Sequence, residues 1–249
     1  MKDENNVIEM KNELITGWFI ISYDENGQKN HHIDFYPNGQ KEFEFNYKDG
    51  KEDGIWTYWY ENGKKKLEKN YKNGKENGIW TYWYENGQKE LEGNSKNGKE
   101  NGIWTYWYEN GQKERKSHYK NGKQKGLTTK WYENGQKELE GNWKDGGLDK
   151  GVHIGWYENG QKKVEGTKKN RKWDGNWTEW YEDGQKKVEG IYKNGEDEGL
   201  WTEWYVNGQK WYERNYKDGK LISSIEWDEE GNVIENVIET KTEKEDTYV

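Results

Sequence analysis

The sequence predicts an all-β fold, an elongated single-layer antiparallel β-meander of about eight 24-residue hairpin repeats. Three observations lead to this prediction. The run WTYWYENG occurs at 56–63 and returns unchanged at 80–87 and 104–111. The tyrosine before each turn recurs every 24 residues, with one interval of 25. Only 29% of the residues are hydrophobic although the chain contains 17 Trp and 19 Tyr, so its apolar area lies in rings and suits a thin sheet without a thick core.

The chain is expected to begin with an acidic segment, residues 1–14, that contains four acids and two lysines. The repeat array follows over 15–225, where positive and negative charges nearly cancel. The tyrosines that mark its repeats are Tyr36, Tyr60, Tyr84, Tyr108, Tyr132, Tyr157, Tyr181 and Tyr205. The extra residue of the long interval lies in KDGGLDKG at 144–151.

Each repeat unit is predicted to be a strand, a tight turn, a second strand and a return loop. GIWTYWY at 54–60 is aromatic and β-branched, which favours a strand. KKKLEKNY at 64–71 sets one leucine among charges, as a mostly exposed strand does. KNGKENG at 72–78 is the return loop. Glycine recurs too often for helices.

The turn between the two strands is predicted from the one copy that contains proline, YPNGQ at 36–40. A two-residue type I′ turn at Asn-Gly would place Pro37 in a paired strand position that needs an N–H group. A type I turn with Pro37 and Asn38 at its centre, followed by Gly39 at positive φ, needs no such donor. We therefore expect a three-residue loop with a glycine bulge.

This turn fixes which side chains share a face of the sheet, because a shift of one residue exchanges the two faces. We expect Thr57 to face Leu67. One face then holds a packing set of Ile55, Thr57, Trp59 and Leu67. The other face holds Trp56, Tyr58 and Tyr60.

The repeats of this one chain differ more on the second face than on the first. The position of Trp59 is Trp in every full copy, and that of Ile55 is aliphatic in all copies but one. A surface that differs between copies is suited to recognition, whereas a surface that repeats holds the array together. The second face is therefore predicted to be an exposed partner-binding surface, comprising Trp56, Tyr58, Trp80, Tyr82, Trp104, Tyr106, Lys130, His153, Glu179 and Glu203.

Residues 226–249 are predicted to form an acidic C-terminal cap and tail. They contain nine acids and two lysines, a net charge of −7 of the −8 of the whole chain. The early part is expected to form a last hairpin that covers the end of the array. Its apolar contacts would come from Val233, Ile234, Val237 and Ile238. The final TKTEKEDTYV is either a solvated tail or an electrostatic lure for a basic partner.

The sequence contains no pattern typical of an enzyme, a metal site or a cofactor site. There is no cysteine, and the four histidines lack zinc spacing; His31 and His32 are adjacent and should point to opposite faces. GNSKNGKE at 93–100 resembles a phosphate-binding loop only as far as Lys99, because Glu100 stands where Ser or Thr would hold magnesium. We expect no enzymatic activity and no cofactor or metal.

Location and partner class follow from composition. No basic flank followed by an apolar run begins the chain, and no stretch approaches about 18 apolar residues. A cytoplasmic protein that does not bind membranes is expected. Direct nucleic-acid binding is not expected, because acids such as Glu68 lie beside the exposed rings and the array is nearly neutral, whereas phosphate-binding surfaces are basic. The expected partner is another protein.

The unit GxWTxWYxNGQKxxEGxYKxG resembles the MORN repeat, in the variant found in bacterial proteins described as antitoxin-like. The resemblance covers about 15–225 and depends on the W-Y-x-N-G run, the following K-x-G and the period near 24. It implies a scaffold that binds proteins or, in some eukaryotic members, phospholipid, and it supplies no catalytic motif. A fainter resemblance connects the aromatic hairpins with choline-binding and cell-wall-binding repeats.

Three functions remain open at this point. The first is a protein-binding array that sequesters or neutralises a partner, as an antitoxin does. The second is an inhibitor of a nucleic-acid-binding or phage-defence protein, in the manner of an anti-CRISPR protein, which presents acidic and aromatic surface in place of phosphates. The third is binding of a ligand or lipid by cages of rings. The sequence does not identify the partner.

Overall fold

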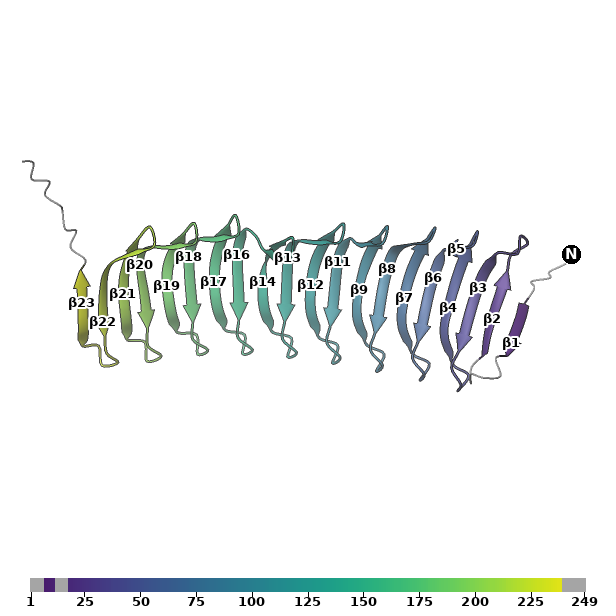
Figure 1. Ribbon diagram of the computed structural model, residues 1–249. Coiled ribbons are helices and arrows are strands. Elements are labelled where there is room, and N and C mark those ends of the chain that lie inside the picture. Colours follow the sequence, from purple (N-terminus) through teal and green to yellow (C-terminus); the bar gives the residue numbers. More distant parts are fainter. Residues whose placement is uncertain (1–6, 12–17, 239–249) are drawn as a thin grey trace, which may run out of the picture. The chain divides into compact units, whose positions relative to one another are not determined.

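A computed structural model describes residues 7–11 and 18–238, with side chains for 18–237. The chain divides into two compact units, Met1–Gly135 and Gln136–Val249. The described residues form strands and turns only. In each unit the successive hairpins pair in chain order and antiparallel (Figure 1). The predicted all-β meander of hairpin repeats is therefore confirmed.

The first unit contains thirteen described strands. They are β1 (Val7–Lys11), β2 (Trp18–Tyr23), β3 (Lys29–Phe35), β4 (Lys41–Lys48), β5 (Lys51–Glu52), β6 (Gly54–Trp59), β7 (Lys65–Lys72), β8 (Lys75–Trp83), β9 (Lys89–Lys96), β10 (Lys99–Glu100), β11 (Gly102–Trp107), β12 (Lys113–Lys120) and β13 (Lys123–Trp131). The short strands β5 and β10 pair with the strand before them and lead into β6 and β11.

The second unit contains ten described strands. They are β14 (Lys137–Lys144), β15 (Gly147–Leu148), β16 (Gly151–Trp156), β17 (Lys162–Lys169), β18 (Lys172–Trp180), β19 (Lys186–Lys193), β20 (Glu196–Trp204), β21 (Lys210–Lys217), β22 (Lys220–Trp227) and β23 (Val233–Ile238). The insertion in KDGGLDKG falls between β14 and β16, where the irregular segment still contributes the two-residue strand β15.

The turn that follows each WY pair has the predicted three-residue form. The N–H of Tyr60 donates to the carbonyl of Lys64 and that of Gly63 donates to the carbonyl of Tyr60, both at 2.9 Å, and Gly63 has a φ of 80°. The same bonds close the turn around Pro37, which sits where no N–H is required. Only glycine adopts this backbone conformation without strain, so its recurrence is explained.

The return loops are tighter, and they define the opposite edge of each sheet. Lys72 pairs with Lys75 across a two-residue turn in which Asn73 and Gly74 have φ values of 50° and 75°. Two consecutive positive φ values are the property of a type I′ turn, which Asn-Gly favours. Each repeat therefore alternates between two kinds of turn at two edges.

The register predicted for the hairpin is wrong by one residue beyond the first pair. Trp59 faces Lys65, but a bulge then leaves Lys66 without a partner, and Thr57 faces Glu68 instead of Leu67. A bulge inserts one residue into one strand and moves every later side chain to the other face. Leu67 therefore faces Tyr58 and lies on the same side of the sheet as the rings.

The assignment of packing and exposed faces is wrong for the rings and for Ile55, although Thr57 of the predicted packing set is buried, with 7% exposure. We call the side that carries Trp56, Tyr58, Leu67 and their equivalents the ring face, and the side that carries Ile55, Thr57, Trp59 and their equivalents the aliphatic face. The buried apolar side chains are Phe45, Trp104 and Trp201, with 9%, 3% and 9% exposure, and all lie on the ring face. The aliphatic row is exposed instead.

The predicted C-terminal hairpin is present, but its apolar side chains are exposed. β22 pairs with β23, with Trp227 opposite Val233. Val233 and Ile234 are each 60% exposed and Val237 is 40% exposed, so these side chains are not buried as the predicted cap requires. The side chain of Ile238 and the tail 240–249 lie outside the described residues, as does most of the predicted acidic segment 1–14. The boundaries at 14 and 225 stay predictions.

Candidate functional site

The ring face is built by placing a large ring of one strand directly over a glycine of the strand before it. A Cβ added at Gly93 would lie 2.1 Å from the ring of Trp104, and one at Gly190 would lie 2.1 Å from the ring of Trp201. Side-chain atoms never approach so closely, so only glycine admits these rings. The indole nitrogen of Trp104 donates to the carbonyl of Asn94 at 3.2 Å, which satisfies its one polar group.

Repeats that lack glycine at this position use other complementary pairs. Phe45 stacks on Trp56 with ring centroids 3.9 Å apart. Lys69 holds its ammonium 3.9 Å from the ring centroid of Trp80, a favourable cation–π contact. Ser117 and Thr128 are both buried and their hydroxyl groups are 3.2 Å apart. In each of these repeats a different complementary pair of side chains fills the equivalent position on the ring face.

The ten residues predicted as an exposed partner-binding surface do lie together on the ring face, but none of them is fully exposed. Trp104 and His153 are buried, each 3% exposed. The half-buried members are Trp56, Tyr58, Trp80, Tyr82, Tyr106, Lys130, Glu179 and Glu203. Their predicted exposure is wrong because each ring covers its neighbours along the sheet. Partner binding through them stays a prediction.

His153 shows how strongly this face excludes water. Its ring occupies the position of Trp104 in its own repeat, and a Cβ at Gly141 would lie 2.1 Å from its Nδ1. Neither ring nitrogen has a hydrogen-bond partner. Burial, and then the nearby charge of Lys168, lower the pKa of His153 below its usual value. The imidazole is therefore kept neutral.

The aliphatic face presents one exposed apolar side chain in each of four successive repeats of the first unit. The exposed fractions are 45% for Ile55, 57% for Ile79, 45% for Ile103 and 45% for Leu127. Asn46 and Asn70, which lie one repeat earlier, donate side-chain N–H groups to the carbonyls of Ile55 and Ile79. These side-chain bonds hold the row where the backbone pairing with the preceding strand is interrupted.

Beside this row the same face carries a ladder of tryptophan, lysine and glutamate. Lys65 contacts Glu68 at 2.5 Å and lies 5.8 Å from the ring centroid of Trp83 in the next repeat. The bulge at Lys66 makes this possible, because it brings residues three apart onto one face. Such exposed pairs contribute about 0–1 kcal/mol each, so they keep the face soluble more than they stabilise it.

Sequence reasoning missed the role of the tyrosine that marks each repeat. The hydroxyl of Tyr60 donates to the carbonyl of Trp83 at 2.7 Å, and Tyr84, Tyr157 and Tyr181 make the same bond to the following repeat. The signal was visible, because this tyrosine is present in every full copy. Within each unit these bonds tie neighbouring repeats together and use the donor of each hydroxyl.

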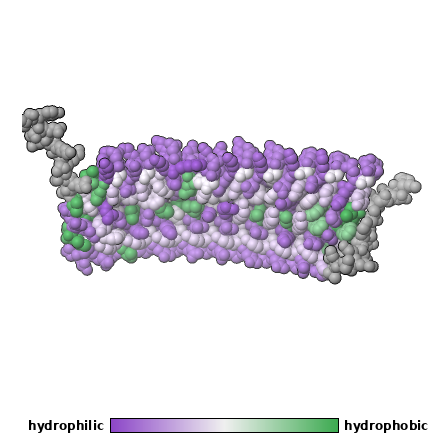
Figure 2. All heavy atoms as spheres, viewed as in Figure 1, coloured by the Kyte–Doolittle hydropathy of each residue, from purple (hydrophilic) through white to green (hydrophobic). Residues whose placement is uncertain are grey.

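Hydrophilic side chains gather along both turn-bearing edges, with hydrophobic side chains between them (Figure 2). His31 and His32 lie on opposite faces as predicted: His31 is 3.0 Å from Glu44, whereas His32 packs edge-on against Phe43. Among residues 7–11 and 18–238 no group of three or more His, Cys, Asp or Glu is placed to hold a metal ion. No helix in the same residues is long and apolar enough to cross a membrane.

Comparison with known families decides what kind of array this is. The model of the MORN repeat variant matches residues 31–49, 52–73, 76–97, 100–121, 124–145, 173–194 and 197–218, together more than half of the 249 residues. The chain belongs to the MORN repeat variant family. The predicted resemblance is thereby confirmed for the repeat itself. Proteins built from MORN repeats are scaffolds for binding, and this array has the matching hairpin architecture.

Other comparisons add little to the MORN assignment. No curated protein matches the chain. A solved structure described as the crystal structure of TcdB2-TccC3-Cdc42 matches with 10% identity and a TM-score of 0.23. That match covers 95% of this chain, and the chain spans only 14% of the other. Similarity at this level carries no argument about function.

Proposed function

We propose that this MORN repeat protein is a non-enzymatic scaffold that binds another protein and sequesters or neutralises it, and that the aliphatic face makes the contact. The observation that carries the proposal is the exposed row of Ile55, Ile79, Ile103 and Leu127 on one face of the sheet. Apolar side chains that repeat in line on one surface mark an interaction site more than scattered ones do.

The size of the row favours a partner that spans several repeats. Burial of an isoleucine side chain contributes about 1.5–3 kcal/mol, so covering the exposed half of one contributes about 1 kcal/mol. Association itself costs about 4 kcal/mol or more. One or two repeats therefore bind too weakly, whereas four repeats with their neighbouring tryptophans can exceed this cost. A folded protein surface meets that requirement better than a small ligand.

Binding through the ring face, as the sequence predicts, remains the competing proposal. Its half-buried members, such as Tyr82 and Tyr106, differ from their counterparts Glu179 and Glu203 in the second unit, which would suit recognition. The aliphatic face is favoured because its apolar area is exposed, whereas that of the ring face is already covered by neighbouring rings.

Matched variants of β8 and β11 separate the two faces. Ile79→Asn with Ile103→Asn alters only the aliphatic face and introduces the residue found at the equivalent position 176. Tyr82→Glu with Tyr106→Glu alters only the ring face and introduces the residue found at 179 and 203. Because the chain itself accepts each replacement in another repeat, both proteins should fold.

The partner is captured from an extract of the source cells, purified, and titrated against each protein by calorimetry. We expect the isoleucine pair to weaken binding at least about tenfold and the tyrosine pair to change it less than about threefold. The reverse ranking assigns recognition to the ring face. If no purified candidate discriminates either variant from the wild type, the proposal of a protein-binding scaffold is contradicted. The partner's own activity, measured with and without the array, tests neutralisation.

A further inference from the structure

The return-loop edge of each unit carries a series of equivalent turns, and three of them hold a carboxylate. The backbone N–H of Asp218 donates to Glu198 at 2.8 Å, and that of Asn194 donates to Asp174 at 3.1 Å. In the first unit the N–H of Asn73 donates to Asp53 at 3.2 Å. In each case the acid lies one repeat before the turn that it caps.

The site at Glu198 shows what the turn does to a carboxylate. Lys217 and Lys193 place their ammonium groups 3.0 Å and 3.5 Å from one oxygen of Glu198, while the N–H of Asp218 binds the other. This N–H, and then the lysines, lower the pKa of Glu198 to about 2. The turn is therefore a ready-made carboxylate-binding site.

Two consecutive turns of the first unit, at Asn97 and Asn121, have lysines at the positions of Lys193 and Lys217 but no acid at the position of Glu198. Asn77 and Asn101 stand at the positions of Glu198 and Asp174. Within the described residues, no side chain accepts a hydrogen bond from the backbone N–H of Asn97 or Asn121, which are the counterparts of Asp218. The donors of the carboxylate site thus remain, without the carboxylate.

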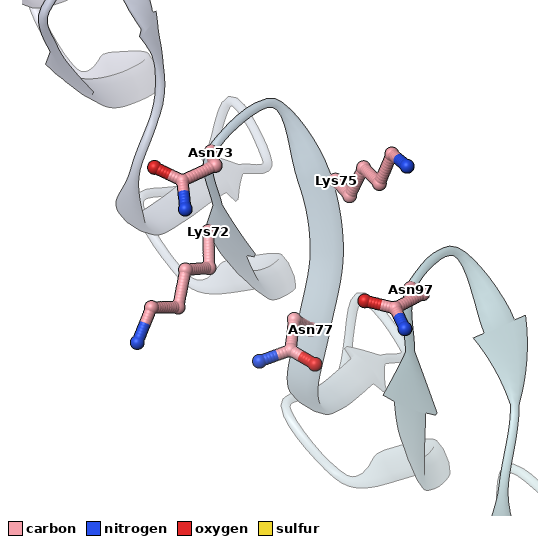
Figure 3. A pocket seen from close by; sticks show the side chains of 5 residues that line it. All are labelled: Lys72, Asn73, Lys75, Asn77 and Asn97. Carbon is pink, nitrogen blue, oxygen red and sulfur yellow. The ribbon is translucent and has the colours of Figure 1, made fainter.

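Both places are depressions lined by lysine and asparagine alone. One, of about 310 Å³, contains Asn77 on β8 and Asn97 on the following turn, with Lys72 and Lys75 (Figure 3). The other, of about 580 Å³, contains Asn101 and Asn121 with four lysines, Lys75, Lys96, Lys99 and Lys120. None of these lysines forms an ion pair within the described residues, and Lys96 directly faces Lys99 across its turn. The same lysine pair faces across the sister turn at Lys217 and Lys220, where Glu198 contacts Lys217, so an acid of a partner would meet an equivalent charge here.

We propose that this edge binds an extended acidic segment of a partner protein, whose carboxylates fill the two positions that Asn77 and Asn101 leave without one. The two depressions are one repeat apart, about 9.6 Å at two strand spacings of about 4.8 Å. Three residues of a chain in the extended polyproline II conformation rise about 9.3 Å and complete one turn, so side chains three residues apart point to the same side. Carboxylates spaced three residues apart therefore meet both turns together.

The observations favour a carboxylate over a nucleic-acid phosphate. The sister turns of this chain hold a carboxylate in the equivalent position. No aromatic side chain lines either depression, so a base would find no ring on which to stack. This edge is distinct from the aliphatic face, so partner capture through that face would survive failure of this inference.

The test introduces a carboxylate of the chain itself at both positions, so that an acidic peptide can no longer bind there. Asn77→Asp with Asn101→Asp recreates the arrangement at Asp53 and Asp174 and should fold at least as stably as the wild type. The control, Asn86→Asp with Asn110→Asp, changes the net charge equally at the opposite edge, where the chain already carries Asp183 at the equivalent position. Thermal unfolding of both proteins verifies that they are folded.

The probe is a fluorescent peptide that repeats Glu-Ser-Gly, titrated by anisotropy at a salt concentration on the order of 10 mM. We expect wild-type binding, a loss of at least about tenfold in the Asn77 and Asn101 variant, and less than about twofold change in the control. Absence of peptide binding to the wild type, or equal loss in both variants, overturns the proposal. Tighter binding of oligothymidylate or of phosphatidylserine vesicles, lost in the same variant, overturns it in favour of a phosphate ligand.

Discussion

The pairing of glycine with tryptophan on the ring face predicts a strong energetic coupling between Gly93 and Trp104. Replacing Gly93 by Ser places a Cβ where the ring of Trp104 lies, 2.1 Å from the nearest ring atom. Forcing an extra atom into a filled site costs about 1–3 kcal/mol. Replacing Trp104 by Thr removes a ring that is 3% exposed, at a cost of about 3–5 kcal/mol.

The double variant recreates the pair that the chain uses in the next repeat, Ser117 with Thr128, whose hydroxyl groups are 3.2 Å apart. The clash then disappears, because no ring lies over position 93. If the two changes acted independently, they would cost about 4–8 kcal/mol together. We expect the double variant to be about 1–3 kcal/mol more stable than this sum, which is the whole overpacking cost.

Urea unfolding, followed by tryptophan fluorescence and circular dichroism, gives the free energy of unfolding of the wild type, both single variants and the double variant. Gly147→Ser is the control for the intrinsic effect of the substitution, because a Cβ at Gly147 meets no atom within 4 Å. It should change the free energy of unfolding by less than about 0.5 kcal/mol. Additive costs at positions 93 and 104 would refute the packing argument for the ring face.

Three further predictions concern single side chains. Trp201→Ala should lower the free energy of unfolding by about 3–5 kcal/mol and Ile79→Ala by less than about 1 kcal/mol, measured by urea unfolding; similar losses would contradict the face assignment. Because burial lowers the pKa of His153 below its usual 6.5, the unfolded chain gains its proton at higher pH than the folded chain, so stability falls as pH decreases below about 7 toward the folded pKa. His153→Trp should reduce this loss in melting curves taken across that range, and an unchanged pH dependence would contradict the burial. Tyr60→Phe removes the bond to the Trp83 carbonyl and should cost about 0.5–1.5 kcal/mol in the same urea assay; no loss would mean that this bond does not tie the repeats together.

The hairpin turn was predictable because one residue excluded the alternative. Pro37 cannot donate an N–H, so a single copy of the repeat identified the turn for all of them. The bulge at Lys66 was not predictable in the same way, because lysine fits a paired or an unpaired strand position equally well. The spacing of Lys65 and Glu68 is compatible with either register until the contact between them is seen.

The predicted faces differ from those of the structure because, in this sheet, a side chain that repeats regularly is not thereby buried. Ile55 and its equivalents are similar in most copies, yet they are exposed, whereas the ring positions differ because each is matched to a different neighbour. Glycine at 93 and 190 was the overlooked signal, since it stands opposite a tryptophan in the adjacent strand. Comparison of the repeats shows that Asn77 and Asn101 stand where other copies have an acid. Only the bond from the N–H of Asp218 to Glu198 shows that this acid binds the next turn.

Thiol labelling measures most directly whether the aliphatic face is the surface that meets a partner, because the chain has no cysteine of its own. Ile79→Cys and Tyr82→Cys place one thiol on each face of β8. We expect the thiol at position 79, where the native side chain is 57% exposed, to react faster in the free protein and to become protected when the purified partner is bound. The thiol at position 82 should react slowly and change little. Protection at 82 with none at 79 would contradict the assignment of binding to the aliphatic face.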